Sequence, residues 1–117
     1  YTQYALFYPE RATATVSSFI DLYGKTLRFE KPDFDKFPCL KLGHKVLEMG
    51  GIMPAVLHGA DHVAVQAFIE NKIGFMDIPR IIEEILHQTT NVLNPDIHQI
   101  IEAEKNAQKA ALEVLSA

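Results

Sequence analysis

Two histidines stand four residues apart in the stretch "AVLHGADHVAVQAFIENKIGF", residues 55–75. If this stretch is helical, His58 and His62 project to the same side, because residues four apart are neighbours on a helix. Two imidazoles in that arrangement can coordinate Zn²⁺. The zinc-protease pattern also needs a glutamate directly after the first histidine as general base, and that position is Gly59.

A metal site would need a third protein ligand, and the sequence does not mark one. The candidates are His44, Asp61 and His87. Gln66 and Glu70 continue the same four-residue spacing, while nearly all other residues of the stretch are apolar. We therefore favour a mostly buried helix whose polar stripe faces water or a neighbouring domain. A metal-binding bundle stays open as an alternative.

The chain contains a single cysteine, Cys39, so it has no disulfide framework of its own. This residue follows Pro38 at the start of a predicted helix, where the helix dipole can lower a thiol pKa. Its neighbours Phe37 and Leu40 are apolar, which favours a buried structural cysteine instead. No glycine-rich dinucleotide loop, phosphate loop, Gly-x-Ser-x-Gly elbow or Cys-x-x-Cys pair is present. The residues alone therefore assign no catalytic group and no metal ligand.

The composition is that of an ordinary globular domain, with 117 residues, 48% hydrophobic and 22% charged. The net charge is −4 without a basic block, which argues against nucleic acid as a partner. No apolar run has the length of a membrane span. The chain begins with Tyr1 rather than Met, and no signal peptide is visible. We expect a processed chain or a fragment.

Four helices are predicted after Asp35. The first has Pro38 near its first turn and ends at Gly50 and Gly51. The second runs from about residue 54 to residue 70. Apolar residues fall at helical spacings along the first helix: Phe37, Leu40, Leu42, Val46, Leu47 and Met49.

The third helix is predicted to begin at Asp77 as its cap, with Pro79 in the first turn. The fourth is predicted to open with Asn94 as cap, Pro95 in its first position and Asp96 near the positive end of the dipole. Four helices with short connections predict a compact bundle. One apolar face of the third helix consists of Ile78, Ile81, Ile82 and Ile85.

Residues 1–35 differ from the rest, because they hold all four tyrosines. Regular structure is also interrupted there by Pro9, Gly24 and Pro32. In residues 25–31, Leu27 and Phe29 alternate with polar neighbours, which predicts a short strand. The predicted fold class is therefore mainly α. An extended N-terminal leader with a short strand precedes a four-helix bundle.

Three blocks of the sequence carry a resemblance to a known family. They read "YALFYPER", "LRFEKPDFDKFPCLKL" and "PAVLHGADHVAVQAFIENKIGFMDIPRIIEEIL". In order and spacing they resemble the C-terminal part of 1-deoxy-D-xylulose 5-phosphate reductoisomerase. The resemblance covers almost the whole chain and is weakest over residues 90–117. The block from Phe29 to Leu42 and the turn "KIGFMDIP" are its most specific parts.

The resemblance implies an enzyme that uses NADPH and Mg²⁺ or Mn²⁺ to convert 1-deoxy-D-xylulose 5-phosphate to 2-C-methyl-D-erythritol 4-phosphate, in non-mevalonate isoprenoid biosynthesis. It implies that residues 1–35 are the end of the catalytic domain and a connector, and that residues 36–117 are a C-terminal four-helix bundle. The N-terminal Rossmann domain and most of the catalytic domain are missing here. This piece alone is therefore expected to bind no cofactor and to be inactive. Only Leu6 carries over, as a residue near the nicotinamide.

The resemblance further implies a homodimer in the full-length form, and a location in the bacterial cytoplasm or the plastid stroma. The chain departs from the family at residues 58–62, which read His-Gly-Ala-Asp-His where Asn-Ala-Ala-Asn-Glu is usual. Gly43 also stands where alanine is common. These changes put a standard domain contact in doubt. A free-standing helical interaction module without catalysis, such as a dimer formed through the leader, is the other alternative.

Overall fold

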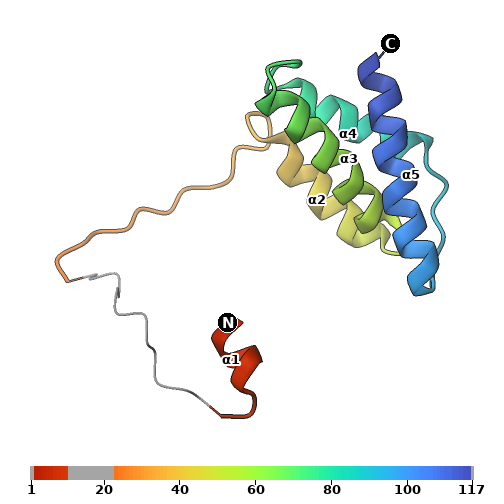
Figure 1. The fold of residues 1–117 in the computed structure, drawn as a ribbon. Coiled ribbons are helices and arrows are strands. Elements are labelled where there is room, and N and C mark those ends of the chain that lie inside the picture. Colours follow the sequence, from red (N-terminus) through yellow and green to blue (C-terminus); the bar gives the residue numbers. More distant parts are fainter. Residues whose placement is uncertain (1, 11–22, 117) are drawn as a thin grey trace. The chain divides into compact units, whose positions relative to one another are not determined.

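The computed structural model describes residues 2–10 and 23–116. The chain divides into two compact units, Tyr1–Glu30 and Lys31–Ala117. Its described elements are all helical, in the order α1 to α5 (Figure 1). None of the helices in these ranges is both long enough and apolar enough to span a bilayer.

The first unit contains a short helix that the sequence did not predict. Helix α1 covers Thr2–Phe7 in a segment expected to be extended. The ring of Tyr4 meets the ring of Tyr8 edge-on, with centroids 5.9 Å apart. Aromatic side chains four residues apart meet in this way when the backbone coils, and such pairs stabilise a helical turn.

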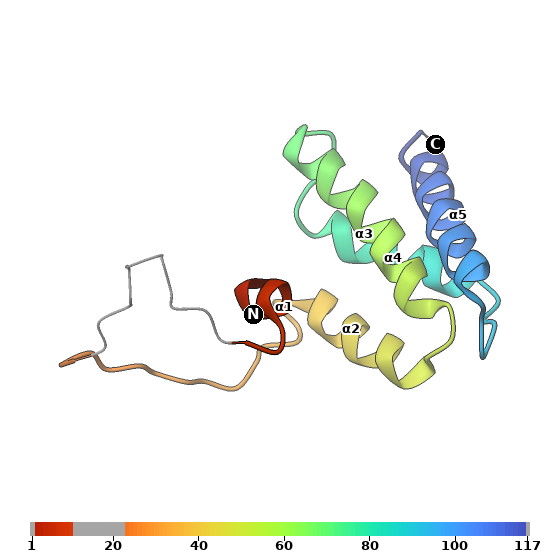
Figure 2. The same cartoon turned by 60° about the horizontal axis from the view of Figure 1, so that its bottom comes forward.

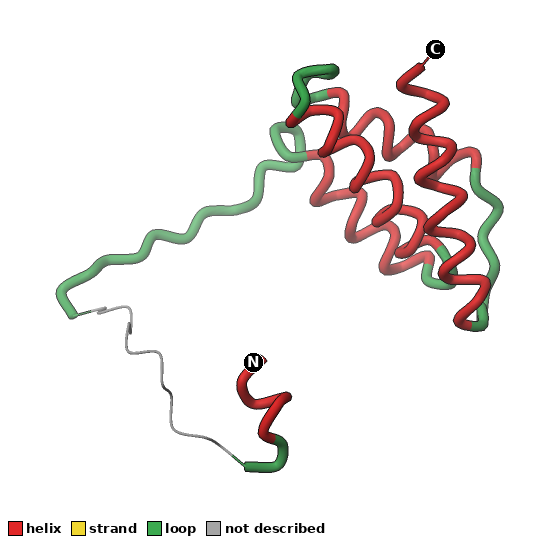
Figure 3. The backbone as a smooth tube through the Cα atoms, viewed as in Figure 1, coloured by secondary structure: helices red, strands yellow, loops and turns green. Residues whose placement is uncertain are grey.

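The strand predicted at residues 25–31 is wrong. These residues have no regular secondary structure (Figure 3). The side chain of Leu27 is 65% exposed and that of Phe29 is 87% exposed. Alternation predicts a strand only where a second strand pairs with the backbone and a core covers one face. No strand is present in residues 2–10 and 23–116 to pair with this segment.

The second unit confirms the predicted four-helix bundle. Helix α2 covers Pro38–Met49, with Pro38 in its first position. Gly50, at a positive φ of 60°, donates its backbone N–H to the carbonyl of Val46 at the end of the helix. Helix α3 covers Met53–Ile69, α4 covers Asp77–Gln88 and α5 covers Ile97–Ser116. Proline and glycine therefore predicted the ends of α2 well, because each limits the local backbone.

Two predicted caps are shifted. Asn94 lies in the loop with a φ of 56°, and Asp96 is the residue that caps α5. The Asp96 carboxylate accepts the Gln99 N–H at 2.8 Å, and the Gln99 side-chain oxygen accepts the Asp96 N–H at 2.9 Å. This reciprocal pair satisfies two backbone donors at the helix start. Asp77 is the first residue of α4 rather than its cap, and its carboxylate accepts the Gly74 N–H at 2.8 Å.

Helix α3 is the centre of the bundle. It packs against α2, α4 and α5, and its largest interface is with α5. Figure 2 shows α3 and α5 side by side and running in the same direction. The buried residues of α5 are Ala103, Ala107 and Ala111, and Gly59 of α3 lies against Ala107, so the two backbones approach closely. The residues with the largest fully buried side chains are Met53, Val56, Ile82 and Ile85.

Candidate functional site

The histidine stripe of α3 lies on the surface of the bundle. His58 and His62 are exposed and Asp61 is half-buried. The Nε2 atom of His58 lies 3.7 Å from a carboxylate oxygen of Glu104 on α5. The stripe therefore faces α5 of the same bundle and water, and its contact with a neighbouring domain stays a prediction.

Two of the three candidates for a third metal ligand, His44 and His87, lie on other helices, whereas Asp61 lies on α3 next to His62. His87 is on α4, where its Nε2 atom lies 3.9 Å from a carboxylate oxygen of Glu83. His44 is on α2, and its ring contacts the ring of Phe34. Within residues 2–10 and 23–116, no group of three or more histidine, cysteine or acidic side chains is placed to hold a metal ion.

The thiol of Cys39 is exposed, so the expectation of a buried structural cysteine is wrong. Partial burial raises the pKa of this thiol, and the negative charge of Asp61 raises it further. A backbone hydrogen bond lowers it by less than these two effects raise it. The net shift of the Cys39 pKa is therefore upward, opposite to the activation that a helix start could provide.

An apolar groove runs between α2 and α3, with a volume of about 350 Å³. We call it the α2–α3 groove. Two of its leucines are conspicuously exposed, Leu40 at 43% and Leu47 at 74%. Above Gly43 there is open space, since an added Cβ would meet no atom within 4 Å. The α2–α3 groove is lined by Cys39, Leu40, Gly43, His44, Val46, Leu47, Pro54 and Leu57.

The sequence itself carries a signal for this groove. Helix α2 has two apolar stripes instead of one. Leu42 and Val46 are buried in the bundle core, whereas Leu40 and Leu47 face outward. A helix with one apolar stripe needs one partner surface. The second apolar stripe of α2 therefore indicates a second partner surface.

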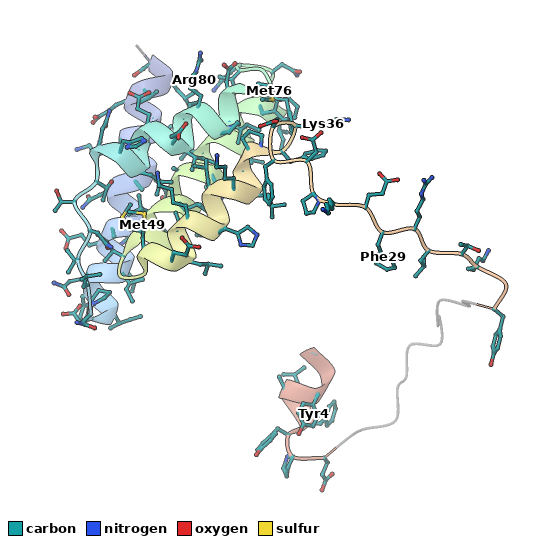
Figure 4. The ribbon with its side chains drawn as sticks, turned by 180° about the vertical axis from the view of Figure 1, so that it is seen from behind. Tyr4, Phe29, Lys36, Met49, Met76 and Arg80 are labelled. Atoms are coloured by element: carbon teal, nitrogen blue, oxygen red, sulfur yellow. The ribbon has the colours of Figure 1, made fainter. Side chains whose placement is uncertain are left out.

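Two other grooves are more polar. The groove between α2 and α4 is lined by five charged residues, together with apolar ones such as Met76. Figure 4 shows Met76 and Arg80 at the end of the bundle where Lys36 precedes α2, with Met49 at the other end of α2. A groove between α3 and α5 contains His62, Glu70 and Lys72. Charged side chains of this kind are readily solvated. The charged residues between α2 and α4 are Asp35, Lys41, Lys45, Arg80 and Glu83.

Leu6, the one position carried over from the resemblance, lies in α1 and is 77% exposed. Its neighbours Phe7 and Tyr8 are 54% and 73% exposed. The first unit therefore exposes apolar and aromatic side chains. Its contact with a cofactor stays a prediction.

Comparison with known proteins decides the family. The sequence profile described as "DXP reductoisomerase C-terminal domain" matches residues 2–110. The chain belongs to the DXP reductoisomerase C-terminal domain family. Similar relatives are 1-deoxy-D-xylulose 5-phosphate reductoisomerases. The one from Caldanaerobacter subterraneus is 48% identical over 100 residues, and the one from Methylobacillus flagellatus is 46% identical over 112 residues.

A solved structure of a DXP reductoisomerase is also similar. It is the enzyme from Zymomonas mobilis in complex with NADPH, with 30% sequence identity and a TM-score of 0.82. The match covers 97% of this chain and 30% of that one. The Caldanaerobacter and Methylobacillus relatives are covered over 26% and 28% of their length. This DXP reductoisomerase C-terminal domain chain therefore spans less than a third of the enzymes that it resembles.

Proposed function

We propose that the chain is the C-terminal structural portion of a 1-deoxy-D-xylulose 5-phosphate reductoisomerase. The family match over residues 2–110 carries this proposal. The whole enzyme would rearrange 1-deoxy-D-xylulose 5-phosphate and reduce the product with NADPH to 2-C-methyl-D-erythritol 4-phosphate, with Mg²⁺ or Mn²⁺. The bacterial origin of the relatives supports the cytoplasm over a plastid as the compartment.

The chemistry is assigned to the rest of the enzyme. The described residues do not fit a Mg²⁺ or Mn²⁺ site, because no three acidic or histidine side chains converge among them. We propose that residues 1–35 end the catalytic domain and connect it to the bundle, and that residues 36–117 support that domain. The full-length form is proposed to be a homodimer, in which this chain's partners are the Rossmann and catalytic domains.

Leu6 is proposed to contact the nicotinamide of NADPH. Its exposed side chain supports this role, because an uncovered leucine can pack against the ring of a cofactor. In the full-length enzyme, Leu6→Ala should raise the KM for NADPH several-fold and leave the KM for the sugar phosphate unchanged. Leu27→Ala, at another exposed leucine of the first unit, is the matched control. Equal effects of the two substitutions would remove the assignment of Leu6.

The reading frame and the intact mass of the native protein test the proposal as a whole. We expect a frame that extends well upstream, beginning with a Rossmann fold. The purified full-length protein should oxidise NADPH when it is given 1-deoxy-D-xylulose 5-phosphate, and the 117-residue chain should not. A native protein that begins near Tyr1 would overturn the proposal.

A free-standing interaction module is the second candidate. The exposed apolar side chains of the first unit favour it, because surfaces of this kind pair with a second surface. It requires the 117-residue chain to form a well-behaved dimer through its leader. Sedimentation of that chain separates the two candidates, since a stable monomer would count against the module.

A further inference from the structure

We infer that the α2–α3 groove is the surface on which the preceding part of the reductoisomerase docks, filling the groove with an apolar surface of its own. This inference rests on the proposed function, and it names the face of the bundle that meets the partner.

The composition of the groove is the first argument. Its eight lining residues include no lysine, arginine, aspartate or glutamate. The exposed stripe of α2, Leu40 and Leu47, faces it together with Pro54 and Leu57 of α3. Covering such a surface with apolar side chains is favourable, whereas leaving it in water is not. By contrast, the α2–α4 groove carries five charged residues and needs no cover.

The length of chain outside this structure identifies the occupant. The chain matches a C-terminal domain and spans 26–30% of its relatives, so most of each relative precedes the matched part. The polypeptide enters the bundle between the two grooves of α2. Phe34, just before α2, lines the α2–α4 groove, and its ring centroid lies 6.3 Å from that of His44, which lines the α2–α3 groove. A covalently attached partner has a high effective concentration at such a site, which a separate protein lacks.

Cys39 provides a probe for the cover, because it lines the groove and is exposed in this chain. We would label the 117-residue chain and the full-length enzyme with a maleimide and identify the modified Cys39 peptide by mass. Cys39 should react at least about tenfold more slowly in the full-length enzyme, since the groove must first open.

Two substitutions sharpen the test. Leu47→Lys places a charge in the groove at a position that is 74% exposed in the bundle, so the bundle itself stays folded. In the full-length enzyme it should restore much of the labelling of Cys39. Leu112→Lys, at a residue of α5 that is 58% exposed and outside the groove, is the control and should restore none.

The outcomes separate the inference from the proposed function. Full-length protein that is active, but labels at Cys39 as fast as the 117-residue chain, overturns the docking surface and leaves the enzyme assignment intact. Labelling of the 117-residue chain that speeds up on dilution would show that a second copy covers the groove, which also overturns the inference. Absence of reductoisomerase activity from the full-length protein would contradict the proposed function instead.

Discussion

Gly59 of α3 lies directly against the backbone carbonyl of Glu104 in α5. A Cβ atom at Gly59 would overlap that oxygen and come within 3.1 Å of the Ala107 methyl group. The two helices therefore approach each other more closely here than any residue with a side chain would allow.

Gly59→Ala should destabilise the bundle. The added methyl group forces α3 and α5 apart, and overpacking of this kind costs about 1–3 kcal/mol. Gly43→Ala is the matched control, because Gly43 is also inside a helix but has open space around it. That substitution should stabilise the chain by roughly 0.5–1 kcal/mol. Urea unfolding measures both, and a stabilising effect at both positions would contradict the close helix contact.

Asn91 ties two loops together. Its side-chain amide donates to the carbonyl of Met49 at 3.2 Å, and its side-chain oxygen accepts the Ile52 N–H at 3.2 Å. Asn91→Ala should lower the free energy of unfolding by about 1–3 kcal/mol, because two hydrogen bonds are lost. Asn91→Asp keeps the acceptor and loses the donor, so its free energy of unfolding should also be lower than that of the wild type. Asn106→Ala, on the exposed side of α5, is the control and should have little effect on thermal unfolding.

The reactivity of Cys39 should depend on pH in a defined way. Burial and the carboxylate of Asp61 both raise the pKa of the thiol. The alkylation rate of Cys39 should therefore begin to rise at a higher pH than the rate for a free cysteine. Asp61→Asn removes the negative charge and should shift the pH–rate profile of iodoacetamide labelling to lower pH. An unchanged or upward-shifted profile in this variant would show that Asp61 does not act on the thiol.

Zinc should not stabilise the chain. A metal ion that binds the folded chain, at a free concentration of 100 times its Kd, would add about 2.7 kcal/mol to the free energy of unfolding. We expect the same Tm with added Zn²⁺, with a chelator and with neither. If Zn²⁺ raised the Tm and His58→Ala and His62→Ala each abolished the rise, the metal-binding alternative would be correct.

The helices of the bundle could be predicted because their signals are local. Pro38 and Gly50 fix the ends of α2 through their own backbone limits, and the isoleucines of α4 show their spacing directly. All four of those isoleucines are buried, as expected. The cap of α5 was missed because Asn94, Pro95 and Asp96 all suit a helix start, and only the reciprocal bonds with Gln99 reveal which one caps.

The features that the sequence did not predict depend on surroundings. Alternation over residues 25–31 indicates a strand only if a partner strand is present, and the sequence does not say whether one is. The exposure of Cys39 follows from the direction in which one face of α2 points. Burial of one apolar stripe in the bundle leaves the other outside. Apolar neighbours in sequence could not distinguish these two stripes.

The packing of α3 on α5 has a consequence for biosynthesis. Helix α4 lies between them in the chain, so the largest interface of the bundle joins segments that are far apart in sequence. A ribosome produces α3 well before α5, and during that interval the small-residue face of α3 has no cover. The nascent bundle must therefore wait for its last helix before it can close. A delay in the synthesis or emergence of α5 would prolong the period in which that face is open to chaperones or to aggregation.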